Sequence, residues 1–226
     1  MSGGLAFCLS KPFFTSESSA ESPAMAGMDP AEIADGSASQ GRGPIIRSFL
    51  LWQGTWLALV VGAGQGHPGL AALPGIAGVG IALLARRAPA RELQVLGFAA
   101  LLGVLVDGLL HRLGWVGFPA AARSGVLLDA VVLPNWMALL WVNLAAHCAP
   151  GTAFGWLDGR LRLAVIIGAT SGPLAYLGGA KLGAVSIPPI GESPWPLPAL
   201  AIVWGIAFPG LLVLRSRLMT SERRAA

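Results

Sequence analysis

Six long apolar runs constrain this chain more than any other feature. They cover residues 45–63, 68–85, 93–113, 125–147, 161–182 and 197–214. Each is close to the roughly 20 residues that an α-helix needs to cross the hydrocarbon core of a bilayer. Inside lipid, such a segment satisfies its backbone hydrogen bonds by forming a helix. The sequence therefore predicts an all-α, polytopic transmembrane bundle of about six spans. The second run is the weakest, because Pro74 and several glycines interrupt it.

Composition agrees with a membrane protein. The chain is 54% hydrophobic and only 12% charged, with a mean hydropathy of +0.68, whereas soluble domains carry about 25% charged residues. The basic residues stand singly or in pairs without interleaved aromatics, so no nucleic-acid partner is expected. Cys8 and Cys148 belong to no CxxC motif, so neither a disulfide nor a cysteine metal site is predicted.

The first 43 residues differ in character from the rest. They are rich in Ser, Gly, Ala and acidic residues and show no sustained periodicity, which predicts a disordered N-terminal tail over residues 1–43. We assign residues 44–217 to the six-span bundle and residues 218–226 to a basic cytoplasmic tail.

Charged residues between the apolar runs alternate in number from one side of the predicted bundle to the other. Eleven basic residues fall on one side: Arg42, Arg47, Arg86, Arg87, Arg91, Arg160, Arg162, Arg215, Arg217, Arg223 and Arg224. Three fall on the other: Arg112, Arg123 and Lys181. The positive-inside rule then places both termini in the cytoplasm, and an even number of spans agrees. The eight Trp residues are expected to anchor helix ends at the membrane interface.

The stretch of residues 171–185, which begins within the fifth run, contains features that a simple anchor would lack. Glycines recur at four-residue spacing, which lets neighbouring helices approach closely, and Pro173 tends to bend a helix. We interpret the run as a packing centre with contributions from Gly168, Gly172, Pro173, Gly179 and Gly183. On the predicted topology, Tyr176 and Lys181 lie in its outer half, where they form one wall of an outward-facing polar pocket.

Ionisable residues inside spans are functional candidates, because they are expensive to bury in lipid. Asp107 and His111 lie one helical turn apart on one face, an arrangement suited to acid/base catalysis or ligand binding. The alternative is a structural role in which Asp107 pairs with Arg112, Arg123 or Lys181. Asp129 either faces Asp107 across the predicted pocket or lies at a helix end in the headgroup region.

Polar residues elsewhere in the spans have two interpretations. Asn143 and His147, four residues apart, either cap a cytoplasmic-side cavity or form hydrogen bonds between helices. Gln53 is a candidate ligand contact or a second interhelical contact. The three histidines map to opposite membrane sides, and no HExxH, phosphate-loop or GxSxG motif is present. We therefore predict no metal site and no cofactor.

The order of several short motifs resembles an uncharacterised family of bacterial multi-pass inner-membrane proteins. The matching stretches lie between Phe49 and Leu214: Trp52-Gln-Gly-Thr-Trp56, Gly62-Ala-Gly64, Gly103-Val-Leu-Val-Asp107, Pro134-Asn-Trp136, Leu140-Trp141, His147, Gly172-Pro173, Tyr176, Lys181-Leu-Gly-Ala-Val185, Trp204 and Pro209. The resemblance implies a bacterial inner-membrane location and a lipid-related role without an assigned activity. It nominates Gln53, Trp56, Asp107, Trp136, His147, Tyr176 and Lys181 as site residues.

Two functional classes follow from these observations. The first is a non-enzymatic membrane protein that binds, moves or scaffolds a small or lipidic molecule, with Gln53, Asp107, Asp129, Tyr176 and Lys181 as binding residues. The second is an intramembrane enzyme acting on lipid acyl chains or head groups, with Asp107 and His111 as acid/base candidates. A role as one subunit of a larger membrane complex remains a third interpretation.

Overall fold

The computed structural model describes residues 30–84, 89–123 and 134–223. Within these residues it contains six α-helices and no strands, and a single antiparallel bridge joins Gly117 to Ser186. The helices are α1 (Pro30–Gly64), α2 (Pro68–Leu84), α3 (Pro89–Arg112), α5 (Asn135–Ala146), α6 (Leu161–Lys181) and α7 (Pro196–Arg223). Two short 3-10 turns, η2 (Ala120–Ala122) and η3 (Gly155–Leu157), lie in the connections. The predicted all-α class is confirmed.

Proline and glycine mark many of the helix boundaries. Helices α2, α3 and α7 begin at a proline, and α5 begins directly after Pro134, because the first helical turn needs no backbone donor at that position. Helix α6 ends at Lys181, and Gly183 follows with a φ of +81°. A left-handed glycine at this position is a common way to terminate a helix.

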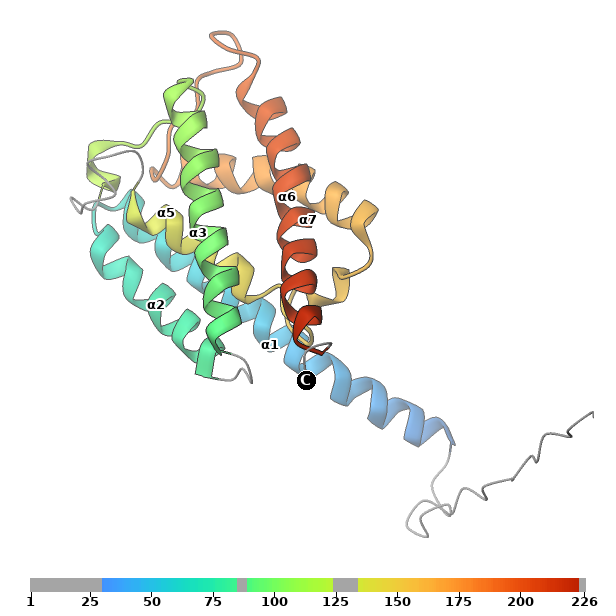
Figure 1. Cartoon of the computed structure of the whole chain (residues 1–226). Helices are drawn as coiled ribbons and strands as arrows, with labels where there is room; N and C mark the ends of the chain where they lie inside the picture. Colours follow the sequence, from blue (N-terminus) through green and yellow to red (C-terminus); the bar gives the residue numbers. More distant parts are fainter. Residues whose placement is uncertain (1–29, 85–88, 124–133, 224–226) are drawn as a thin grey trace, which may run out of the picture. The chain divides into compact units, whose positions relative to one another are not determined.

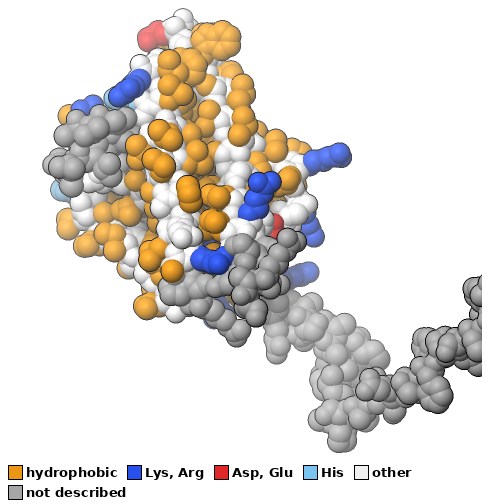
Figure 2. Space-filling view, viewed as in Figure 1, with side chains coloured by type: hydrophobic (Ala, Val, Ile, Leu, Met, Phe, Trp, Pro, Cys, Tyr) orange, Lys and Arg blue, Asp and Glu red, His pale blue; other side chains and the backbone are white. Residues whose placement is uncertain are grey.

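Four of the helices are long and apolar enough to cross a membrane: Arg42–Gly64 within α1, Ala90–Arg112 in α3, Leu161–Lys181 in α6 and Pro196–Met219 in α7. Many large apolar side chains on these helices are exposed, including Leu105, Leu109, Ile202 and Ile206. Figure 2 shows such side chains covering much of one face. Surfaces of this kind suit contact with acyl chains, so the chain is a membrane-embedded protein.

The remaining two helices are shorter. Helix α2 has 17 residues and includes Pro74, in keeping with the weakness of the second predicted span. Helix α5 has 12 residues, or about 18 Å of length, so the helix described there is shorter than the predicted span 125–147. Its start follows Pro134, which disfavours a helical conformation for the residue before it. The rest of that predicted span, residues 124–133, lies outside the described residues, as do the first 29 residues of the predicted N-terminal tail.

The helices of residues 40–226 pack around two adjoining hydrophobic clusters. Helix α6 packs against α7, and α3 packs against both α5 and α7; Figure 1 shows α3 and α7 side by side. One cluster includes Leu59, Leu110 and Trp136, and the other includes Val95, Leu144 and Leu211. Val106 and Trp204 contact both clusters. Asp107 therefore lies beside the junction of the two clusters.

Candidate functional site

Asp107 is a fully buried carboxylate in the second half of α3, with 0% of its surface exposed. The Tyr176 hydroxyl of α6 donates a hydrogen bond to Oδ1, and Nε1 of Trp141 in α5 donates one to Oδ2 at 2.7 Å. Among the described residues no Lys or Arg forms an ion pair with Asp107. The predicted structural partners Arg112, Arg123 and Lys181 are all exposed, so the expectation of a cationic partner is wrong. Two neutral donors satisfy the carboxylate instead.

Aromatic rings extend this contact to a fourth helix. The ring of Trp204 in α7 stacks on Trp141 at 4.6 Å between centroids, with an interplanar angle of 17°. It also meets Tyr176 edge-on at 6.5 Å. Aromatic pairs of this kind contribute about 0.5–1.5 kcal/mol beyond the burial of their surface. Asp107 and the three rings therefore connect α3, α5, α6 and α7 at one point.

Glycines make room for these large rings. A Cβ at Gly172 in α6 would overlap the side chain of Trp204, and one at Gly168 would overlap the Trp204 backbone. A Cβ at Gly103 in α3 would overlap the ring of Trp141. The predicted packing role of Gly168 and Gly172 thus has a specific partner in α7. Pro173 lies within α6, whose helix continues through it.

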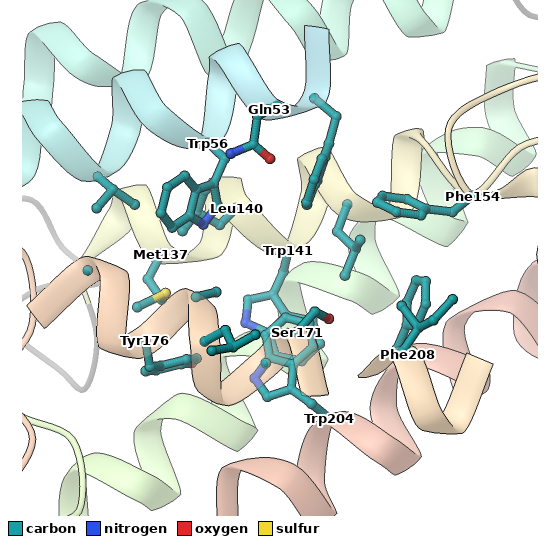
Figure 3. A pocket seen from close by; sticks show the side chains of 18 of the residues that line it. Gln53, Trp56, Met137, Leu140, Trp141, Phe154, Ser171, Tyr176, Trp204 and Phe208 are labelled. Atoms are coloured by element: carbon teal, nitrogen blue, oxygen red, sulfur yellow. The ribbon is translucent and has the colours of Figure 1, made fainter. Parts of the chain in front are cut away.

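An apolar cavity of about 480 Å³ opens beside the aromatic rings. Figure 3 shows its walls, which come from α1, α5, α6, α7 and the segments that follow α5 and α6. Nine of its lining side chains are aromatic: Phe49, Trp52, Trp56, Trp136, Trp141, Phe154, Tyr176, Trp204 and Phe208. Five of the chain's eight Trp residues are among them. The sequence predicts indoles at the helix ends; Trp156 and Trp195 are exposed in the connections on either side of α6 and agree with that prediction.

Two exposed polar residues on facing helices lie at the edge of the cavity. Gln53 is the central residue of the apolar part of α1, Arg42–Gly64, and Ser171 is the central residue of α6. Both line the cavity and both are exposed. In a helix that crosses the bilayer, a central residue lies within the acyl-chain layer. This edge of the cavity is therefore at mid-length of both helices.

The other predicted site residues are dispersed. His111 donates from Nδ1 to the Val116 carbonyl at 2.9 Å and is not hydrogen-bonded to Asp107. Lys181, the last residue of α6, is exposed and does not line the cavity. Asp129 lies outside the described residues. Of the five predicted binding residues, Gln53 and Tyr176 line the cavity and Asp107 lies directly behind it. The described residues of the predicted polar pocket therefore do not line one cavity: Tyr176 lines the apolar cavity, Asp107 lies behind its wall and Lys181 lies elsewhere.

Asn143 and His147 connect α5 to α1. Nδ2 of Asn143 donates to the Trp52 carbonyl at 3.3 Å, and Nδ1 of His147 is 2.7 Å from Oγ of Ser48. The same Ser48 hydroxyl accepts a hydrogen bond from the Ala153 amide at 3.0 Å. These contacts favour the interhelical interpretation over a polar cap. They also hold α1, which carries one wall of the cavity, against the other helices.

One buried ion pair was not expected from the sequence. Arg215 of α7 donates from Nη2 to Oε1 of Glu92, near the start of α3, and both residues are about 95% buried. We had assigned Arg215 to the basic loops. The available signal was Glu92 itself, a carboxylate followed directly by the apolar run of α3. No group of three or more potential metal-binding His, Cys, Asp or Glu side chains occurs in the described part of the chain.

The comparisons with known proteins found one family. The family model described as "Protein of unknown function (DUF2878)" matches residues 45–210, a range that contains every wall of the cavity as well as Asp107. This match confirms the resemblance to an uncharacterised family. No curated protein and no solved structure matches the chain.

Proposed function

The chain belongs to this family of unknown function, and we propose that it binds a lipidic molecule in the aromatic cavity. The carrying observation is the cavity itself, about 480 Å³ with nine aromatic lining residues. Its volume falls within the roughly 300–1,000 Å³ of typical small-ligand sites. Burying a hydrocarbon chain there gains roughly 25 cal/mol per Å² relative to water. The surrounding lipid solvates a hydrocarbon chain as well, so the preference of a ligand for the cavity over the bilayer must come from the shape of the cavity and its aromatic contacts.

The position of the cavity supports entry from the bilayer. Gln53 and Ser171 mark an edge at the middle of two spanning helices, where the surrounding solvent is acyl chain. A ligand that enters there is already dissolved in the membrane. The few polar groups in the lining, among them the Tyr176 hydroxyl, offer limited contacts for a hydroxyl or carbonyl group on an otherwise apolar molecule. A headgroup with full charge has no counter-charge in this lining.

Tryptophan fluorescence provides the test, because five indoles surround the cavity. Methyl dibromostearate, an uncharged ester whose bromine atoms quench indole emission on contact, is titrated into the purified protein in mild detergent. We expect saturable quenching for the wild type. Ser171→Phe, which places a ring at the edge of the cavity, should weaken it strongly. Thr170→Phe is the matched control, since Thr170 is the neighbouring exposed hydroxyl residue and does not line the cavity. Equal, non-saturable quenching in all three proteins would contradict the proposal.

A second candidate is an intramembrane enzyme acting on lipid. The observation that favours it is the hydrogen bond between Asp107 and Tyr176, because Tyr176 lines the cavity and its hydroxyl is a potential proton donor to a bound molecule. Tyr176→Phe separates the two candidates, since it keeps the ring and removes the hydroxyl. A binding protein retains saturable quenching and leaves cellular lipid composition unchanged. An enzyme that uses Tyr176 shows a changed lipid profile, equal to that of a deletion strain.

We also place the protein in the bacterial inner membrane with both termini in the cytoplasm. The described arginines support this orientation. Arg42 and Arg47 lie near the start of the apolar part of α1, Arg91 near the start of α3 and Arg162 near the start of α6, whereas Arg217 lies near the end of α7. With α2 and α5 as the returning segments, all of these arginines lie on one side, which the positive-inside rule assigns to the cytoplasm.

A further inference from the structure

A second pocket lies at the arginine-rich end of the helices and is distinct from the aromatic cavity. It measures about 210 Å³ and is formed by the last turns of α7 and the loop between α5 and α6. Arg215, Ser216 and Met219 line it from α7, and Cys148 and Asp158 line it from the loop. The two pockets share no lining residue. Inferences about this pocket therefore do not depend on the proposed function.

Arg215 is the central polar group of this pocket. It is only 4% exposed, and its Nη2 is committed to Glu92. Its Nε and Nη1 atoms have no hydrogen-bond acceptor among the described residues. Buried polar groups in native proteins are nearly always paired, and guanidinium donors cannot be removed by deprotonation. Arg215 as a residue lines the pocket, whereas these two nitrogen atoms are themselves buried in its wall, so an oxygen atom of a bound group reaches them only when a neighbouring side chain of the wall moves.

The charges around the pocket favour an anionic group. Arg160, Arg162 and Arg217 are exposed at the same end of the helices, and Figure 2 shows basic side chains in the lower part of that view. Burial raises the pKa of the Cys148 thiol to about 12, against an opposing effect of Arg215, so this residue adds no negative charge. Asp158 is the acidic residue in the lining. It is exposed like the three arginines, so solvent screens all four charges, and the arginines outnumber it.

The depth of the pocket matches the headgroup region. Arg215 lies 19 residues after Pro196, the first residue of α7, a separation of about 29 Å along a helix. This length is close to the roughly 30 Å thickness of the hydrocarbon core. If α7 begins at one membrane surface, Arg215 lies at the other. Basic pockets between helices at this level are suited to anionic lipid headgroups.

We propose that the pocket around Arg215 binds the phosphate of a membrane lipid headgroup. Phosphate presents several strong acceptor oxygens to the Nε and Nη1 donors, while Glu92 keeps the guanidinium in place. A free phosphate compound offers the same chemistry, and the experiment has one arm for each source.

The test measures ligand-dependent thermal stability of the purified full-length protein in mild detergent. One arm compares dioleoylphosphatidylglycerol with dioleoylglycerol, which has the same chains and no phosphate. The other compares inorganic phosphate with chloride at equal ionic strength. The variant is the double substitution Glu92→Gln with Arg215→Met, which removes the guanidinium without leaving a lone buried charge or changing net charge. We expect a phosphate-bearing probe to stabilise the wild-type protein. Its apparent affinity for the double variant should be at least about tenfold weaker.

Arg217→Gln is the matched control, because Arg217 is an exposed arginine two residues further along α7 and does not line the pocket. It should change the affinity by less than about twofold. Arg215→Lys is a second variant in case the double substitution fails to fold, since it keeps the positive charge and loses the two unpaired donor positions; it should weaken binding similarly. Stabilisation by the lipid alone assigns the site to a headgroup, and stabilisation by inorganic phosphate assigns it to a free compound. Equal effects of the two lipids with no effect of phosphate, a wild-type response in the Arg215 variants, or an equal loss in Arg217→Gln would overturn the proposal.

Discussion

Asp107 illustrates how a buried acid can serve structure and site together. Its two oxygens are each occupied by a donor from a different helix, the Tyr176 hydroxyl and the Trp141 indole. Both donors belong to side chains that line the aromatic cavity. The carboxylate therefore orients part of the cavity wall without touching what the cavity contains. In the proposed binding protein, Asp107 is a positioning residue. It can act on a ligand only indirectly, through the hydroxyl of Tyr176.

Replacing Asp107 should destabilise the protein even without any ligand. Asp107→Ala leaves two buried donors without an acceptor, at a cost of about 1–3 kcal/mol each, so we expect the free energy of unfolding to fall by roughly 2–6 kcal/mol. Denaturation of the purified protein by increasing SDS measures this. Asp158→Ala, at an exposed aspartate, should change stability by no more than about 0.5 kcal/mol. A similar result for the two variants would mean that Asp107 is not an essential acceptor.

The sequence identified Asp107 but not its partners, and the reason is physical. A carboxylate within an apolar run is conspicuous because its burial is expensive. An interpretation based on charge predicts a cationic partner. The donors here are instead the phenol of Tyr176, 69 residues away, and the indole of Trp141, 34 residues away. Hydropathy treats tyrosine and tryptophan as largely apolar residues. Whether the hydroxyl or indole N–H group donates to a particular acceptor depends on the packing of the folded chain. The same limit explains why the aromatic cavity was not predicted, although Gln53 and Tyr176 in its lining were.

At the scale of elements, the contact between α6 and α7 depends on glycines, which have no side chain to separate the two helices. Gly168 and Gly172 each bring α6 against Trp204 or its backbone. Spacing alone predicted that these glycines serve packing, since small residues four positions apart share one helix face. The identity of the opposing residue could not be predicted, because it depends on how two distant helices align. Helix α5 shows a second limit of the sequence. Hydropathy predicts one continuous span over residues 125–147, whereas Pro134 has an extended conformation and α5 begins directly after it.

Adding one methyl group at this contact should separate the two helices. The Cβ of Gly172→Ala would overlap the Trp204 side chain, and overpacking of this kind typically costs about 1–3 kcal/mol. We expect that loss in SDS denaturation, together with weaker quenching by methyl dibromostearate because Trp204 forms part of the cavity wall. Gly97→Ala is the control, since Gly97 lies in α3 with no atom close to an added Cβ. There alanine should be neutral or stabilise by up to about 1 kcal/mol. Equal behaviour of the two variants would rule out the close α6–α7 contact.

At the scale of the whole molecule, the two proposed sites lie at different levels along the spanning helices. The edge of the aromatic cavity is at the centre of α1 and α6, whereas the Arg215 pocket lies near the end of α7. A mid-membrane apolar site and a headgroup-level basic site are both expected of a protein whose ligand and surroundings are lipids. Each site has its own probe, a brominated acyl chain or a phosphate, so the two proposals succeed or fail separately.

The last prediction concerns the proposed orientation of the bundle in the membrane. Helix α6 separates Asp158 from Gly191, and its 21 residues extend about 31 Å, enough to place the two exposed residues on opposite sides of a membrane. In a background with Cys8→Ser and Cys148→Ala, a membrane-impermeable maleimide should label Gly191→Cys in intact bacterial cells. It should label Asp158→Cys only after the inner membrane is permeabilised, because the proposed orientation places the arginine-rich side, which includes Asp158, in the cytoplasm. Labelling of both from outside would mean that α6 does not span the membrane, and the reverse pattern would mean that the arginine-rich side is exported.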